Sequence, residues 1–204
     1  MAVAWNAGML RMSVLVMTLL AGLAGTTRAG ELDLALGLQA TQTDWPDDAG
    51  GGPNLSAAWW FRPWIGASFI GKEHYAPVDD RLMSYYSVNA AVRRDLGTLR
   101  LGVTLGFVHQ HEQTRAAIEA QPLASLFGVA DGMRHRMATR SGIQLALPIR
   151  DRAKGEWYVA LDLDGTVFAE ADRGPRWMSS AGLSIGFTHD FSRKAPASGQ
   201  LAAR

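Results

Sequence analysis

The stretch Glu31–Gln39 reads ELDLALGLQ and decides the fold. Its four leucines share one face of an extended strand, whereas acidic, small and amide side chains share the other. A bilayer core offers no water to backbone groups, so a spanning sheet must close on itself, with apolar side chains toward lipid and polar or small ones toward the lumen. The alternation therefore predicts a strand of a transmembrane β-barrel.

The same period of two recurs about eight times, a strand count within the range of outer-membrane barrels. The expected strands lie near residues 31–39, 54–61, 65–72, 85–93, 99–107, 137–147, 157–167 and 181–191. Between them, long connections alternate with short ones. The long connections are 43–53, 75–83, 112–132 and 169–176, and the short ones are 62–63, 94–98 and 150–155. This alternation predicts an all-β, eight-stranded antiparallel up-and-down barrel, with the long loops outside the cell and the chain ends in the periplasm.

Within the longest loop, Thr114–Ala120 is expected to form a helical turn or two before Pro122. Aromatic residues also gather where the strands end, as amphipathic rings do at a membrane interface. The expected periplasmic set is Trp59, Trp60, Trp64, Trp157, Phe187 and Phe191, and the external set is Tyr75, Tyr85, Tyr86, Phe107 and Trp177. A soluble lipocalin-like barrel is the structural alternative. The faces opposite the leucines are mostly Gly, Ala, Ser, Asn and Thr, which suit a tight lumen better than a solvated exterior.

Three segments divide the chain. Residues 1–29 are expected to be a cleaved signal peptide, because Arg11 precedes an uncharged apolar run shorter than the ~20 residues of a spanning helix. Residues 30–191 form the expected barrel, and residues 192–204 form a polar tail. Without the signal peptide, 18 basic residues face 19 acidic ones, so no basic field for nucleic acid is present. The absence of cysteine excludes disulfides and thiolate chemistry.

This pattern resembles the small bacterial outer-membrane β-barrel superfamily, of the OmpA-transmembrane-domain and OmpX type. Its most specific part is Gly182–Phe191, which looks like the aromatic-ended last strand that the barrel-assembly machinery reads. The resemblance implies a bacterial outer-membrane location, contact with membrane lipids including lipopolysaccharide, and a monomer. It implies no cofactor.

Eight charged side chains fall on the faces that point into the predicted lumen. They are Glu31, Asp33, Lys72, Arg93, Arg100, Arg140, Asp162 and Asp164. The lumen of an eight-stranded barrel is just wide enough for side chains, and buried charges need partners. We expect these groups to form ion pairs that plug the barrel. A gated ion pathway, or a catalytic carboxylate pair at Asp162 and Asp164, is the alternative.

Three histidines fall on one outward face at the external rim. His109 and His111 are two apart on one expected strand, and His135 lies in the same phase on the next. They are interfacial residues on the simplest interpretation. Alternatively, Arg134, His135 and Arg136 contact lipid phosphates, since guanidinium groups bind such anions in bidentate fashion. A third interpretation is a Zn²⁺ or Cu²⁺ site of the three imidazoles, with Glu112 or Asp131 as a further ligand.

A fourth interpretation is a lipid-modifying site, with His109 or His111 as general base and Glu112 as the orienting group. It resembles the outer-membrane lipid A deacylases, whose catalytic His and Ser lie on the outer face of a strand. In this chain the residue two after His109 is His111 and not serine. The sequence therefore favours a structural, surface-interaction or envelope-maintenance protein, with a lipid-directed hydrolase and a small gated channel as alternatives.

Overall fold

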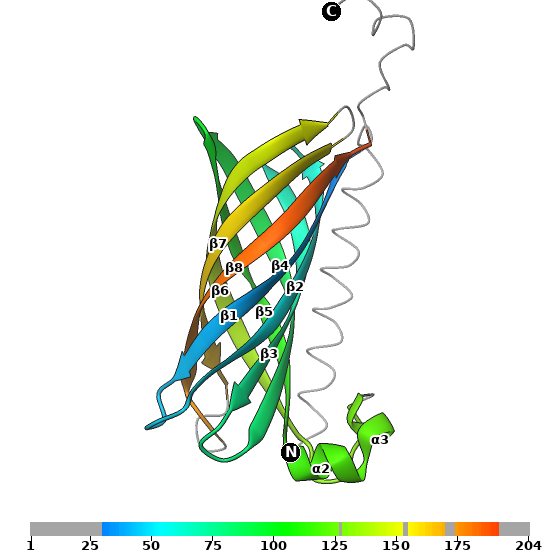
Figure 1. Cartoon of the computed structure of the whole chain (residues 1–204), viewed down its shortest axis with the longest axis vertical. Coiled ribbons are helices and arrows are strands. Elements are labelled where there is room, and N and C mark those ends of the chain that lie inside the picture. The colour runs from blue at the N-terminus through cyan, green and yellow to red at the C-terminus, as the bar shows by residue number, and fades with distance from the viewer. Residues whose placement is uncertain (1–29, 127, 153–154, 170–173, 192–204) are drawn as a thin grey trace, which may run out of the picture.

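A computed structural model describes residues 30–191 except 127, 153–154 and 170–173. The expected signal peptide and C-terminal tail lie outside the described residues. Eight strands form one closed antiparallel sheet in sequence order (Figure 1). They are β1 Glu31–Thr43, β2 Ala49–Arg62, β3 Ile65–Ala76, β4 Arg81–Leu96, β5 Leu99–Thr114, β6 Arg134–Arg152, β7 Gly155–Phe168 and β8 Trp177–Asp190. The predicted eight-stranded up-and-down barrel is confirmed.

Strands β1 and β8 close the barrel by pairing along their whole length. Glu31 lies opposite Asp190 at one end, and Thr43 lies opposite Met178 at the other. Every strand therefore has a partner on both sides, and the described sheet has no open edge. No helix in the described part of the chain is long and apolar enough to cross a membrane.

The two faces of the sheet have the polarity that the alternation predicts. Outward leucines expose much of their surface, 71% for Leu38, 65% for Leu105 and 70% for Leu183. Inward positions are buried and carry most of the charged and hydroxyl side chains of the sheet. The apolar surface thus lies outside, the reverse of a soluble barrel that binds a ligand in its interior.

Several predicted loops are shorter than expected because the strands continue past the apolar band. The loop expected at 43–53 is reduced to residues 44–48, and Gly50, Gly51 and Gly52 belong to β2. At Gly50 a side chain would not fit, since a Cβ would lie 2.1 Å from the carbonyl oxygen of Tyr75. Glycine in this run therefore allows close backbone approach in a strand and does not mark a loop.

The connection between β5 and β6 contains two short helices, α2 Arg115–Ala120 and α3 Pro122–Leu126. The first was predicted, and Thr114 caps it by accepting a hydrogen bond from Ala117 N at 3.3 Å. The second was missed because Pro122 was expected only to end a helix. Proline is also favoured at the first position of a helix, where its missing N–H is not needed.

The long connections leave one end of the barrel, and the short turns leave the other, where β1 begins and β8 ends (Figure 1). At the short-turn end, Trp59 packs on Phe191 with ring centres 5.4 Å apart, and Trp157 packs on Phe187 at 5.1 Å. Two aromatics of the expected outer girdles point inward instead. Trp60 and Tyr85 are buried in the lumen, because each lies in the opposite strand phase to the outward leucines, valines and tyrosines.

Candidate functional site

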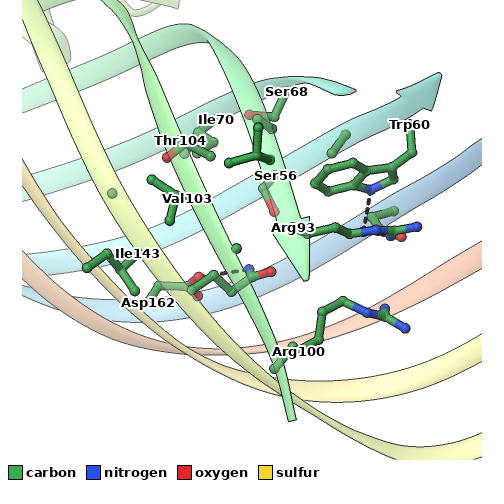
Figure 2. Close-up of a pocket in the computed structure, with 18 of the residues that line it drawn as sticks. Ser56, Trp60, Ser68, Ile70, Arg93, Arg100, Val103, Thr104, Ile143 and Asp162 are labelled. Atoms are coloured by element: carbon green, nitrogen blue, oxygen red, sulfur yellow. Dashed lines mark hydrogen bonds and ion pairs between the residues drawn. The ribbon is translucent and has the colours of Figure 1, made fainter. Parts of the chain in front are cut away.

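Two clusters of charge fill the lumen between its short-turn end and its middle. In the first, Arg93 of β4 pairs with Glu31 and Asp33 of β1. Its Nη1 atom lies 3.3 Å from Asp33 Oδ2, and its guanidinium carbon lies 4.1 Å from a ring centre of Trp60. Trp60 donates its indole N–H to the same carboxylate oxygen at 2.7 Å (Figure 2). Two acidic groups and an aromatic face thus offset the cost of burying the arginine.

The second cluster surrounds Asp164 of β7. Its carboxylate pairs with Lys72 of β3 and lies 3.3 Å from Arg140 Nε of β6. Ser180 donates its hydroxyl to Asp164 Oδ2 at 2.6 Å and accepts a hydrogen bond from Lys72 at 2.9 Å. One carboxylate therefore joins two buried cations from separate strands across the barrel.

The remaining two predicted lumen charges have partners that sequence reasoning did not assign. Arg100 pairs with Asp95 at 3.1 Å and with Glu156 at 2.9 Å, near the short-turn end. Asp162 accepts hydrogen bonds from Gln144 Nε2 at 2.8 Å and from Ser184 Oγ at 2.7 Å. Asp162 and Asp164 also bond to different groups, so they do not form a carboxylate pair that shares a proton.

The space left between these groups is small. A cavity of about 60 Å³ is lined by Asp33, Trp60, Arg93, Tyr158 and Asp162, among others (Figure 2). A cavity of this size holds a few water molecules at most. The lumen at the level of these residues is therefore largely packed.

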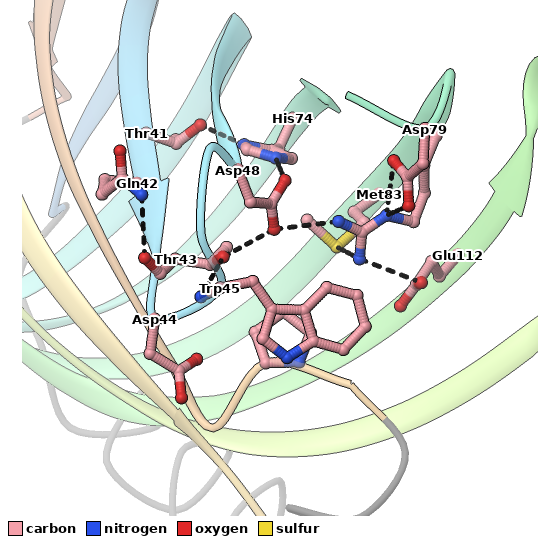
Figure 3. Close-up of polar contacts among 12 residues, drawn as sticks. Thr41, Gln42, Thr43, Asp44, Trp45, Asp48, His74, Asp79, Met83 and Glu112 are labelled. Atoms are coloured by element: carbon pink, nitrogen blue, oxygen red, sulfur yellow. Dashed lines mark hydrogen bonds and ion pairs between the residues drawn. The ribbon is translucent and has the colours of Figure 1, made fainter. Parts of the chain in front are cut away.

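A third cluster closes the lumen at the long-loop end, and sequence reasoning missed it (Figure 3). At its centre, Arg81 of β4 lies 2.8 Å from Asp48, 3.2 Å from Glu112 and 3.0 Å from Asp79. His74 of β3 lies 3.4 Å from Asp48 on its other side. The strand phase could have revealed this cluster, because Arg81 alternates in step with Arg93 and His74 with Lys72.

We call Asp48, His74, Asp79, Arg81 and Glu112 the mouth cluster. Its residues lie beyond the apolar band of the strands, and their burial and mutual contacts shift the pKa values of His74 and Asp48. Burial lowers the pKa of His74 below its ordinary value, although Asp48 acts in the opposite direction. Burial would raise the pKa of Asp48, but the Thr43 hydroxyl and Arg81 stabilise its carboxylate and leave that pKa below the ordinary value. The cluster therefore combines an ionised carboxylate with a neutral imidazole at pH 7.

The three predicted histidines do come together on the outward face, beyond Phe107. His111 lies opposite His135 in the pairing of β5 with β6. The ring centres of His111 lie 4.7 Å from those of both His109 and His135, and His109 and His135 are 5.4 Å apart. Burial and the neighbouring imidazoles lower the pKa of His109 and of His111. Both rings are thus neutral at pH 7 and able to donate a lone pair.

Two residues expected near these histidines lie on the other side of the sheet. Glu112 is 1% exposed and faces the lumen, where it accepts hydrogen bonds from Arg81 and Gln110 and pairs with Arg134. The expectation that Glu112 orients His109 or His111, or adds a metal ligand beside them, is therefore wrong. Consecutive residues of a strand point to opposite faces, so Glu112 cannot share the face of His111.

Arg136 is also buried inside the barrel and does not contact lipid phosphates as expected. Its guanidinium donates to the Pro175 carbonyl oxygen at 2.6 Å and lies 4.2 Å from the ring centre of Phe168. Arg134 lies in the same inward phase, although its side chain at the rim is half exposed and pairs with Glu112. Of the expected phosphate-binding trio, only His135 faces outward.

A serine that sequence reasoning did not find lies beside the histidines. Ser84 of β4 is opposite His111 of β5 in the strand pairing and shares its outward face. The Ser84 hydroxyl donates to Glu73 Oε2 at 2.7 Å. This outward row of Glu73, Ser84 and His111 spans three neighbouring strands, which no linear spacing in one strand could show.

Among the comparisons with known proteins, only the comparison with solved structures finds a match, and it concerns the architecture. No family model matches the chain, and neither does any curated protein sequence. Neisserial surface protein A superposes with a TM-score of 0.53 at 9% identity, covering 79% of this chain and 97% of that one. Ail, the attachment invasion locus protein of Yersinia pestis, superposes with a TM-score of 0.50 at 17% identity, covering 79% and 99%; it was solved with the heparin analogue sucrose octasulfate.

The chain has the fold of a small outer-membrane β-barrel. The predicted resemblance to that superfamily is thus confirmed at the level of fold. The superposition covers 97% of the first solved structure and 99% of the second. The described strands therefore correspond to a whole barrel of this kind. At such low identities, the comparison shows the fold alone.

Proposed function

We propose that this chain is a monomeric integral protein of the bacterial outer membrane with a structural, surface-interaction or envelope-maintenance role. The observation that carries the proposal is the division of the barrel into an apolar outer face and a lumen filled by paired charges. An apolar exterior suits lipid, and a packed interior suits a scaffold more than a transport path. Closure of β1 on β8 removes the sheet edge that would otherwise drive association.

The partners implied are membrane lipids, including lipopolysaccharide at the external rim, and the barrel-assembly machinery during biogenesis. The last strand carries Phe187 and His189 at its end, Phe191 follows directly after it, and His189 packs edge-on against Phe191 with ring centres 4.4 Å apart. Such an aromatic end supports recognition during assembly and placement at the periplasmic interface. The near balance of charge argues against nucleic acid as a partner.

Fractionation and gel mobility test this proposal together. We expect the protein in the outer-membrane fraction after alkaline carbonate extraction, and we expect it to migrate differently on a denaturing gel with and without boiling, since a closed barrel resists detergent until heated. A protein that carbonate extracts, with one mobility at both temperatures, would contradict the proposal.

A lipid-directed hydrolase is the second candidate, because Ser84 supplies the hydroxyl that the sequence interpretation lacked. It lies opposite the neutral His111 and beside the carboxylate of Glu73, at the level where lipid headgroups are expected. In the described conformation, however, its hydroxyl donates to Glu73, so a catalytic role requires transfer of that hydrogen bond to an imidazole. Mass spectrometry of lipid A and phospholipids from cells expressing the wild type or Ser84→Ala decides between the two functions, since identical lipids exclude hydrolysis.

A further inference from the structure

The outward face of the β5–β6 hairpin carries three imidazoles and a thioether within contact distance. His109 and His111 follow each other on one face of β5, and the pairing places Met137 and His135 beside them on β6. No proposed contact with lipid requires three histidines to face one another. Because the side chains come from two hydrogen-bonded strands, their spacing is set by the sheet itself.

The distances between the nitrogen atoms fit a metal ion. His109 Nε2 and His135 Nδ1 are 3.4 Å apart. Two nitrogens bound tetrahedrally to Zn²⁺ at about 2.1 Å also lie about 3.4 Å apart. The third histidine is near enough to join them, since one nitrogen from each of the three rings lies within 4.8 Å of the others. Rotation about the side-chain bonds of His111 is the adjustment needed to complete the set.

Neighbouring side chains contact two of the three rings. The Nδ1 atom of His109 lies 3.3 Å from Met137 Sδ, so the N–H at this position can donate to sulfur while the Nε2 lone pair points toward His135. Metal-binding histidines commonly donate their second N–H in this way. His111 packs edge-on against Tyr86 with ring centres 5.6 Å apart.

Gly128 covers the His111 ring from the loop after α3. Its φ of +71° is a backbone conformation that favours glycine, and a Cβ there would lie 2.4 Å from His111 Cε1. The loop therefore passes directly over the imidazole and leaves no room for a side chain. This contact shields part of the His111 ring from solvent.

We propose that His109, His111 and His135 form a binding site for one divalent transition-metal ion, Zn²⁺ or Cu²⁺, on the outward face at the external rim. Neutral imidazoles suit these borderline ions, whereas Mg²⁺ and Ca²⁺ prefer oxygen ligands. Three protein ligands leave a coordination position open to water or to a group from outside the chain. The site differs from the proposed scaffold role and does not depend on it.

Calorimetric titration of the folded barrel in detergent tests the site. The protein is prepared without a histidine tag, and Zn²⁺, Cu²⁺ and Mg²⁺ are titrated separately. We expect one Zn²⁺ or Cu²⁺ per chain and no heat of binding from Mg²⁺. Replacement of an outer-shell partner lowers metal affinity by about 10–100-fold, so loss of a direct ligand in His111→Gln or His135→Gln should lower it by at least about that much.

His189→Gln is the matched control, because His189 lies at the opposite end of the barrel among Phe187 and Phe191. It should bind the metal as the wild type does. Heat-dependent gel mobility confirms that each variant folds, and a Co²⁺ absorption spectrum of four-coordinate intensity reports the geometry separately from affinity. The proposal is overturned if the wild type binds neither Zn²⁺ nor Cu²⁺, or if folded His111→Gln and His135→Gln bind them as tightly as the wild type.

Discussion

Single carboxylates hold the interior of this barrel together. Asp164 is the clearest case, since it contacts both Lys72 and Arg140 and its side chain is only 4% exposed. Removing one partner of a buried ion pair costs more than the pair contributes, because the remaining charge loses its compensation but stays buried. The residues that matter most for stability are therefore those whose loss leaves a cation alone.

Asp164→Asn should destabilise the barrel strongly while preserving side-chain size. We expect a loss of about 3–5 kcal/mol in the free energy of unfolding, since Lys72 and Arg140 remain buried. Asp162→Asn is the control, because Asp162 bonds to Gln144 and Ser184, which are uncharged, and its loss should cost only about 1 kcal/mol. Urea unfolding in lipid vesicles measures both. Equal losses for the two variants would show that Asp164 does not neutralise the two cations.

His74 makes the stability of the mouth cluster depend on pH. Its pKa in the folded barrel is below 6.5, whereas the unfolded chain takes up a proton near that value. As the pH falls below about 6.5, the unfolded state binds more protons than the folded state, so stability decreases. The facing groups are Asp48, Asp79 and Arg81, and the lowered pKa of Asp48 means that its own contribution is lost only in much stronger acid.

His74→Gln should therefore lose less stability than the wild type between pH 7.5 and pH 5.5. Part of the dependence remains in the variant, because the pKa values of His109 and His111 are also lowered. Unfolding temperatures at several pH values measure the effect, and the difference between the two proteins at each pH isolates the contribution of His74, because all other titrating groups are common to both. Parallel curves for the two proteins throughout would contradict a role of His74.

At the scale of the strand, the sequence was informative where one face meets an apolar environment. The strands β1, β5 and β8 were located from leucine alternation because lipid selects apolar side chains at every second position. Beyond the apolar band both faces meet polar surroundings, so the period of two disappears although the strand continues. This is why β2 was expected to begin at Asn54 and begins at Ala49.

The same limit explains the outcome at the candidate site. Phase alone placed His109, His111 and His135 on one face, since that follows from counting residues along β5 and β6. Glu112 was assigned to them from proximity in sequence, which ignores the face on which it lies. The neighbours on other strands, Ser84 above all, depend on the register between strands, which a single sequence does not specify.

Leu36→Arg tests whether the middle of β1 lies in the hydrocarbon layer of the membrane. Leu36 is 59% exposed near the middle of β1, and arginine at the bilayer midplane costs about 2–4 kcal/mol in barrels of this kind. Val78→Arg is the control, because Val78 is similarly exposed but lies in the connection between β3 and β4, where the expected cost is about zero. Unfolding in vesicles gives both values, and equal costs would place Leu36 outside the hydrocarbon layer.

For the molecule as a whole, the three charged clusters of the lumen follow one another along the barrel axis. Arg93 with its partners lies toward the short-turn end, Asp164 with its partners lies near the middle, and Arg81 with its partners lies toward the long loops. An ion crossing the barrel would have to break each cluster in turn and lose most of its hydration in a cavity of about 60 Å³. We therefore expect the lumen to be closed to ions.

Planar-bilayer recording tests the closed lumen directly. The wild type should insert without producing steady conductance, because an ion would have to separate the paired charges that fill the lumen. A double variant, Trp60→Ala with Tyr158→Ala, removes two rings that line the cavity and should produce brief openings. Gel mobility before and after boiling establishes that both proteins are folded when recorded. Steady channels in the wild type would refute the plugged lumen and favour the gated channel, whereas silence in both proteins would show that the charge clusters close the barrel without the two rings.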